Sequence, residues 1–318
     1  MKILITGSTG FLGSWACRIL SRNHEVIGLC RNNSNQFRLN GIKNFQSIPA
    51  NPIEWGEVIS KHLPDVIIFL HWDGVANQQR NSDIQKANIN FFTQLIETSV
   101  RTKVKKIIGI GSQAELGPLE IPISDLQQDN PTTLYGSTKI ECRENGFKLC
   151  KNTETKFIWG RVFSTYGPLD STSWLIPSAI ISLNKSEQFL STLGKQNWSF
   201  LHAYDFARAI QKLIENDTKK NIFNIGNPST NLIRDVLQLI ENILGKSNLI
   251  QFGKIPYRAD QVMRLEPKCE GLLELGWTPN VKLYDGLKQT IDWYVGKPEK
   301  PLRTISNELE FFNLPDLR

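Results

Sequence analysis

Short apolar runs alternate with amphipathic stretches through the first half of the chain. The apolar runs, rich in aliphatic and β-branched residues, lie at 2–6, 25–30, 66–70, 106–111 and 156–162. Apolar residues recur at helical spacing between several of these runs, at 15–23, 84–102 and 135–152. Short buried strands that alternate with helices are typical of βαβ units. The pattern therefore predicts a doubly wound α/β domain, with a parallel sheet covered by helices on both faces.

The pattern changes near residue 165. Prolines, glycines and tryptophans become frequent, and helical spacing returns at 203–216, 231–245 and 283–295. We predict a Rossmann domain over residues 1–165. Residues 166–318 are expected to form mainly a smaller substrate-binding lobe, with some segments returning to the main domain. The tail from Lys297, polar at first and then apolar, is expected to pack on the body or on a partner subunit.

Composition and charge narrow the class of protein. The 318 residues are 40% hydrophobic and 21% charged, as in soluble globular proteins. The net charge is +6, but the basic residues are scattered and their one short cluster, at 101–106, coincides with an expected helix end. Nucleic acid is therefore not an expected partner. No apolar run is long enough to cross a membrane, and the N-terminus leads into an expected strand instead of a signal peptide, so a cytoplasmic protein is expected.

Cysteine and histidine spacing argues against a metal site. The five cysteines and four histidines are dispersed and show none of the short spacings that zinc sites use. We expect reduced, structural thiols, structural histidines, and no bound metal.

The segment GSTGFLG, at residues 7–13, spaces three glycines evenly between an expected strand and an expected helix. Such glycines allow a tight turn, a close approach of the backbone to a pyrophosphate, and close packing of the helix on the strand. The helix N-terminus adds N–H groups and a positive dipole end. The spacing predicts a dinucleotide site. Its expected cofactor contacts are Gly7, Thr9, Gly10, Phe11, Leu12 and Gly13.

The end of the next expected strand bears on the choice of cofactor. Folds that bind NAD place an acidic residue about 20 residues after the glycine loop, whereas an arginine nearby accommodates the 2′-phosphate of NADP. Here the strand at 25–30 runs into Arg31, Asn32 and Asn33. The sequence favours NADP(H). NAD(H) stays open, because Arg31 could equally be a solvent-facing residue.

Tyr135 and Lys139 lie four residues apart within a helical pattern, which puts them on one face about one turn apart. An ammonium beside a phenol favours phenolate, so we expect Lys139 to lower the pKa of Tyr135 from its usual value of about 10. Ser112 follows the strand at 106–111, at the carboxyl edge where open α/β sheets bind ligands. Its hydroxyl would hold a substrate oxygen while Tyr135 passes a proton.

Together these residues resemble the extended short-chain dehydrogenase/reductase family, which comprises sugar-nucleotide epimerases, dehydratases and reductases. The resemblance covers nearly the whole chain. The segment RVFSTYGP, at 161–168, is similar to the family segment beside the nicotinamide and brings Phe163 and Ser164 into the expected site. Asn88 resembles the family's structural asparagine on the helix before the serine strand.

Two later segments extend the resemblance. SFLHAYDFARAI is similar to a family stretch in which Asp205 is an expected helix cap. PYRADQVM looks like the segment whose arginine grips the nucleotide diphosphate, which makes Arg258 a phosphate-binding candidate through bidentate hydrogen bonds.

Positions at which this sequence departs from the family pattern help to distinguish between the activities found in the family. Gln113 and Ala114 stand after Ser112, where the 4,6-dehydratases carry an Asp-Glu pair for proton transfer at C5 and C6, so we reject a dehydratase. Trp72 and Asp73 replace small residues near the cofactor and are expected to narrow the pocket.

Aromatic positions leave more than one interpretation open. Leu116 replaces a family tyrosine, which puts any role of that ring in doubt. Trp174 and Trp198 fall in loops of the expected substrate lobe, where a ring could stack on a base or sugar or serve only in packing. The substrate-binding candidates are Trp72, Gln113, Ser164, Trp174, Trp198 and Arg258.

The resemblance implies an NADPH-dependent reductase of a nucleotide-linked 4-keto-6-deoxyhexose, of the abequose and paratose synthase type, which serves bacterial surface glycans. Arg31 favours this reading, because a reductase exchanges spent cofactor and commonly uses NADPH. An NAD-dependent nucleotide-sugar 4-epimerase is the alternative, and a non-catalytic dinucleotide sensor is the third. A homodimer is also implied, through helices around 84–101 and 135–151, although the same apolar stripes could be buried internally. The sequence leaves the nucleotide, the sugar and the stereochemistry at C4 open.

Overall fold

A computed structural model of the chain describes residues 1–258 and 260–296. Seven strands form one sheet in the order β11-β6-β5-β4-β1-β2-β3, and all of its pairings are parallel. The strands are β1 (Lys2–Thr6), β2 (Glu25–Cys30), β3 (Phe45–Pro49), β4 (Val66–Phe69), β5 (Lys106–Ser112), β6 (Lys156–Val162) and β11 (Ile222–Ile225). The predicted fold class is confirmed, as are the five strands that the apolar runs indicate.

The sequence pattern misses the two edge strands of this sheet. β3 has only half-buried and exposed residues, and its polar positions and proline break up the apolar pattern. β11 is four residues long and comes far after β6 in the sequence, yet it pairs with β6 at the other edge. Short edge strands depend on tertiary context more than on local pattern.

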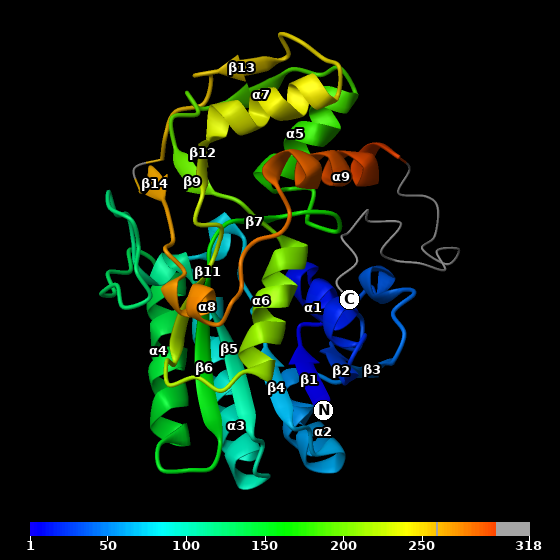
Figure 1. Cartoon of the computed structure of the whole chain (residues 1–318), viewed down its shortest axis with the longest axis vertical. Coiled ribbons are helices and arrows are strands. Elements are labelled where there is room, and N and C mark those ends of the chain that lie inside the picture. The colour runs from blue at the N-terminus through cyan, green and yellow to red at the C-terminus, as the bar shows by residue number, and fades with distance from the viewer. Residues whose placement is uncertain (259, 297–318) are drawn as a thin grey trace.

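Helices cover both faces of the sheet (Figure 1). α1 (Phe11–Leu20) and α6 (Ala203–Glu215) pack on one face, and α2 (Trp55–His62), α3 (Ile84–Arg101) and α4 (Leu134–Cys150) pack on the other. β1 shows the alternation, because Ile3 and Ile5 belong to the first core and Leu4 to the second. Strands that are apolar on both faces are what a doubly wound sheet requires.

The chain after β6 builds another apolar core above the carboxyl ends of the strands (Figure 1). It is surrounded by α5 (Leu175–Asn184), α7 (Ile233–Ile243) and α9 (Leu283–Val295). Small sheets pair β7 (Thr165–Tyr166) with β10 (Leu201–His202), β8 (Phe189–Ser191) with β13 (Ile250–Phe252), and β9 (Asn197–Ser199) with β12 (Thr230–Leu232) and β14 (Arg264–Leu265). α6, β11 and α8 (Glu270–Glu274) return to the main sheet.

All six predicted helical patterns correspond to helices, namely α1, α3, α4, α6, α7 and α9. The predicted packing of the tail concerns residues that lie beyond position 296, outside the described residues. Within residues 1–258 and 260–296, no helix is long and apolar enough to cross a bilayer. No cluster of potential metal ligands occurs in that same part of the chain.

The predicted capping role of Asp205 is wrong. His202 caps α6, because its side chain accepts a hydrogen bond from the backbone N–H of Tyr204. Asp205 lies one turn further in, is fully buried, and accepts hydrogen bonds from the backbone N–H groups of Asn280 and Val281. Its carboxylate also pairs with Arg208 at 2.8 Å. Asp205 therefore fastens the segment before α9 to α6.

Asp205→Asn tests this role. We expect it to lower the free energy of unfolding by about 1–3 kcal/mol, because an amide cannot accept from all of these donors. The measurement is urea unfolding followed by circular dichroism. Asp285→Asn is the matched control, since Asp285 occupies the first turn of α9 but is exposed, and a helix-dipole contribution alone is worth less than about 1 kcal/mol. Equal losses in the two variants would contradict the fastening role.

Candidate active site

A cleft of about 1520 Å³ opens at the carboxyl ends of the sheet strands, between the sheet and the elements that follow β6. Every site residue predicted from the sequence lines this cleft except Asn88. Asn88 is buried on α3, where its side-chain amide exchanges hydrogen bonds with both backbone groups of Asp73. The structure therefore gives Asn88 a supporting place, holding the loop after β4.

The glycine loop joins the end of β1 to the start of α1. Gly7 has a φ of +68°, a left-handed conformation that a side chain would strain. A Cβ on Gly13 would lie 2.2 Å from the carbonyl oxygen of Gly7, so α1 can approach the loop this closely only without a side chain there. Gly10 stands at the N-cap of α1 and leaves the N-terminal N–H groups uncovered on the cleft side. Such a loop is suited to an anionic ligand.

Arg31 leaves the end of β2 and donates a hydrogen bond to Asp73 at 3.2 Å. Asp73 also lies 3.5 Å from Nε2 of His71, and these contacts with His71 and Arg31 lower the pKa of its carboxyl group. Arg38, in the short 3₁₀ helix η1 (Phe37–Leu39), is a second cation that lines the cleft, and it lies in a polar stretch where the sequence pattern predicts no element. It donates to the backbone oxygens of Leu169 and Thr9 and so bridges the glycine loop and the segment after β7.

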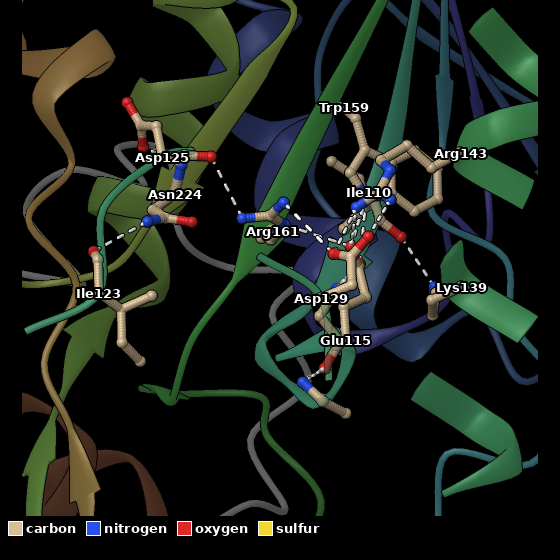
Figure 2. Close-up of polar contacts among 12 residues, drawn as sticks. Ile110, Glu115, Ile123, Asp125, Asp129, Lys139, Arg143, Trp159, Arg161 and Asn224 are labelled. Carbon is tan, nitrogen blue, oxygen red and sulfur yellow. Dashed lines mark hydrogen bonds and ion pairs between the residues drawn. The ribbon is translucent and has the colours of Figure 1, made fainter. Parts of the chain in front are cut away.

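Ser112, Tyr135 and Lys139 line the same cleft, and the side chains of Ser112 and Tyr135 are hydrogen-bonded to each other. Ser112 is the last residue of β5, and its hydroxyl oxygen accepts a hydrogen bond from the backbone N–H of Ala114. The first turn of α4 presents Tyr135, and the next turn presents Lys139 on the same face. Lys139 is buried and donates to the backbone oxygen of Ile110 at 2.7 Å, as Figure 2 shows.

The expected effect of Lys139 on Tyr135 is wrong for this structure. Burial raises the pKa of Tyr135, and the hydrogen bond with Ser112 and the guanidinium of Arg80 oppose that shift. The amine of Lys139 lies 5.7 Å from the centre of the Tyr135 ring and is turned toward Ile110. Burial also lowers the pKa of Lys139 to about 7.

Trp72 packs directly on the amine. The Nζ atom of Lys139 lies 3.4 Å from the centre of the Trp72 ring, an arrangement that attracts a cation to the ring face. The indole is fixed in turn, because its N–H donates to Gln85 at 2.8 Å. Its ring also meets Tyr135 edge-on at 5.8 Å. The sequence predicts only that Trp72 narrows the pocket, whereas the structure also places its ring against Lys139 and Tyr135.

Arg80 is a cleft residue that sequence reasoning missed. Its guanidinium carbon lies 5.6 Å from the centre of the Tyr135 ring, and its backbone oxygen accepts from the N–H of Tyr135. Among the described residues, its buried Nε atom has no hydrogen-bond partner. An irregular loop with no recognisable motif carries it, so only the fold brings it to the phenol.

The remaining candidates line the outer part of the cleft. The indole N–H of Trp198 donates to the backbone oxygen of Val262, which fixes the ring against the loop before β14. Arg258 is exposed and lies 3.7 Å from Asp260. Leu116 is fully buried in a small apolar cluster with Phe163, so the position of the family tyrosine is a packing position here. Gln113, Ser164 and Trp174 also face the cleft.

The low pKa of Lys139 has a consequence for stability. Between pH 7 and the pKa of an unfolded lysine, the unfolded chain binds a proton that the folded chain lacks, so this group makes stability rise with pH. We expect parent protein to gain up to about 1.4 kcal/mol per pH unit relative to Lys139→Met in this window. Urea unfolding at a series of pH values measures the difference. Lys105→Met, at an exposed lysine, should keep the parent slope; the same slope in Lys139→Met would contradict the assignment.

Comparison with known proteins places this geometry in a family. The model of the NAD dependent epimerase/dehydratase family matches residues 3–226. The chain is 28% identical over 243 residues to GDP-L-fucose synthase 1 of Arabidopsis thaliana, across 69% of this chain and 72% of that protein.

Two solved structures show the same fold. UDP-glucose 4-epimerase of Thermotoga maritima, solved with UDP-glucose, has a TM-score of 0.84 at 22% identity and covers 93% of this chain and 99% of its own. UDP-glucuronic acid 4-epimerase of Bacillus cereus, solved with UDP-glucuronic acid and NAD, has a TM-score of 0.83 at 24% identity and the same coverage of 93% and 99%. The family model matches well over half of the length of this chain, so the chain belongs to the NAD dependent epimerase/dehydratase family.

Proposed function

We propose that the protein is an NADPH-dependent reductase that acts at C4 of a nucleotide-linked 4-keto-6-deoxyhexose. The meeting of Ser112, Tyr135 and Lys139 in one cleft with the glycine loop carries this proposal. A hydroxyl, a phenol and an amine in this arrangement can hold a carbonyl oxygen and deliver a proton to it. The third reading, a dinucleotide sensor without turnover, would not need this set of groups.

The loop between β1 and α1 suits a nicotinamide dinucleotide. Because Gly7 and Gly13 carry no side chains, backbone atoms occupy the positions where side chains would otherwise lie. When bound, this cofactor supplies the hydride. Arg31 is proposed to select the 2′-phosphate of NADPH. The other residues proposed to contact the cofactor are Gly7, Thr9, Gly10, Phe11, Leu12, Gly13, Tyr135, Lys139 and Phe163, whereas Asn88 lies outside the cleft and supports the loop after β4.

The other steps of the proposed reaction are assigned to side chains of this protein. Tyr135 donates its proton to the oxygen on C4, and Ser112 holds that oxygen in place. Lys139, held by Ile110 and Trp72, is proposed to bind the nicotinamide ribose, and the guanidinium of Arg80 favours the phenolate that remains. Arg258 is proposed to hold the diphosphate, and Trp72, Gln113, Ser164, Trp174 and Trp198 to surround the sugar and base.

Two features bear on the choice between reductase, dehydratase and epimerase. Gln113 and Ala114 follow Ser112 in the cleft, so elimination at C5 and C6 would lack its acid pair. Arg31 favours NADPH and hence reduction, although its contact with Asp73 places an acidic group beside a phosphate site. The likeness to two 4-epimerases supports the epimerase alternative. Purified protein that carries tightly bound NAD(H) and consumes no NADPH would favour that alternative.

We also propose a cytoplasmic homodimer. α3 and α4 lie side by side on one face of the sheet, as a bundle with a second copy would require. Exposed positions on these helices include Glu97 and Glu141, so such an interface would rest largely on polar contacts.

Tyr135→Phe tests the proton donor. We expect it to lower kcat by about 10²–10⁴, the usual contribution of a general acid. The assay follows the nicotinamide absorbance while NADPH and a panel of nucleotide 4-keto-6-deoxy sugars are offered, with product stereochemistry read by NMR. Tyr284→Phe, at an exposed tyrosine, is the control. Turnover of Tyr135→Phe within a few-fold of the parent would refute the role.

Arg31→Ser tests cofactor selection. We expect the Kd for NADPH to rise about 10- to 100-fold, which is the loss of a charged hydrogen bond, while the Kd for NADH changes little. Quenching of tryptophan fluorescence on titration measures both constants. Arg101→Ser, at an exposed arginine ending α3, serves as the control. An equal change for the two cofactors would make Arg31 a bystander.

A further inference from the structure

Glu115 ends η4 (Gln113–Glu115), the single turn that follows β5, and its side chain is fully buried. One carboxylate oxygen accepts from the backbone N–H of Ser112 at 2.8 Å and from the indole N–H of Trp159 at 3.0 Å. The other accepts from Arg143 and Arg161, both at 3.2 Å. Figure 2 shows Trp159, Arg143 and Arg161 converging on this carboxylate.

The donors belong to the elements that build the part of the cleft lined by Ser112, Tyr135 and Lys139. Ser112 is the last residue of β5. Arg143 follows Lys139 by one turn and Tyr135 by two turns of α4, so it lies on the same side of that helix. Arg161 lies on β6, immediately before the segment that carries Phe163. One carboxylate thus links the serine, the helix of the phenol and amine, and the next strand.

Burial raises the pKa of Glu115, and its contacts with Arg161, Ser112, Arg143 and Trp159 oppose that shift. Asp129 pairs with both guanidinium nitrogens of Arg143 and lies 3.7 Å from Arg161, which gives two carboxylates and two guanidiniums. Buried ion pairs of this kind commonly give no more stability than apolar residues of similar size, but they specify one arrangement of the groups around them. Stability alone therefore does not account for an acid at position 115.

The effect on Ser112 is direct. Its backbone N–H is held by Glu115, and its hydroxyl oxygen accepts from the N–H of Ala114 at 3.2 Å. With both groups fixed, the hydroxyl is held beside Tyr135, with which it forms a side-chain hydrogen bond. Glu115 therefore orients the group that is proposed to hold the substrate oxygen.

We propose that Glu115 is a positioning residue for catalysis: its buried carboxylate fixes Ser112 and, through Arg143, sets α4 so that Tyr135 and Lys139 face the same point. This inference rests on the roles proposed above for these three residues. It does not depend on which sugar is the substrate.

The charge of Glu115 also acts on the reacting groups. Burial beside Trp72 and Ile110 lowers the pKa of Lys139, and Cys142 and Glu115 oppose that shift. Glu115 raises the pKa of Tyr135 as well. Removing the charge should lower the titration midpoint of Lys139, whereas a general loosening of the fold would expose the amine and raise it.

Glu115→Gln and Glu115→Asp separate charge from position. Lysine labelled with ¹³C at Cε reports the midpoint of Lys139 by NMR, assigned with Lys139→Met, and kcat is measured with NADPH and the keto sugar that the parent reduces. We expect Glu115→Gln to lower both the midpoint and kcat, the latter roughly ten- to a hundredfold. Glu115→Asp keeps the charge but withdraws it from Ser112, so kcat falls while the midpoint stays near that of the parent.

Asp125→Asn is the matched control. Asp125 is also buried, accepts from the backbone N–H groups of Asn224 and Gly271 at 2.7 Å, and touches Arg161 through its backbone oxygen, but it lies on the far side of the cluster (Figure 2). This variant should lose stability in urea and keep both kcat and the Lys139 midpoint.

Several results would overturn the inference. One such result is a folded Glu115→Gln variant with the kcat and the Lys139 midpoint of the parent. Another is a fall of both kcat and the Lys139 midpoint in Asp125→Asn. Where the Glu115 variants do not fold, Arg143→Gln leaves the carboxylate with Ser112, Trp159 and Arg161, and an unchanged kcat there would overturn the link to α4. If the parent reduces none of the sugars, the proposed function fails, while the Lys139 midpoint in the Glu115 variants still shows whether Glu115 acts on the buried amine.

Discussion

The contact between α4 and the turn after β5 is the constraint on which the arrangement of Ser112, Tyr135 and Lys139 depends. A Cβ on Gly136 would lie 2.3 Å from the backbone oxygen of Ala114, so the helix and the turn are as close as two backbones can pack. Thr133 caps the same end of the helix by accepting from the N–H of Gly136. This packing brings Tyr135 and Lys139, which are on the helix, to the end of β5, and any side chain at position 136 would push them away.

Local sequence patterns were enough to predict much of the sheet and several parts of the candidate site. Strands β1, β2, β4, β5 and β6, the loop from Gly7 to Gly13, and the shared face of Tyr135 and Lys139 all follow from spacing over a few residues. The structure brings nearly every candidate to one cleft because the carboxyl ends of parallel strands meet at one edge.

What the sequence could not show depends on contacts between distant segments. The ring of Trp72 under the amine of Lys139, and the guanidinium of Arg80 beside Tyr135, join segments with no common motif. Glu115 looks like an ordinary surface acid in a short turn, and only the fold surrounds it with Trp159 and two arginines. Edge strands β3 and β11 were missed for the same reason.

The electrostatics around Tyr135 act in two directions. Burial raises the pKa of Tyr135, which keeps the phenol protonated at neutral pH but makes it a weaker acid. Arg80, beside the ring, favours the phenolate that forms once the proton has left. Proton donation by Tyr135 therefore relies on Ser112 and Arg80 to offset the effect of burial on its pKa.

The return of α6 and β11 to the main sheet also limits how the chain can be divided. Phe206 and Ile210 of α6 and Phe223 of β11 complete the same apolar core as Ile3 and Ile5. A fragment that stopped near residue 165 would leave this face uncovered and the edge of β6 unpaired, both of which promote aggregation. The nascent chain would therefore need protection by a chaperone until residue 225 has emerged from the ribosome.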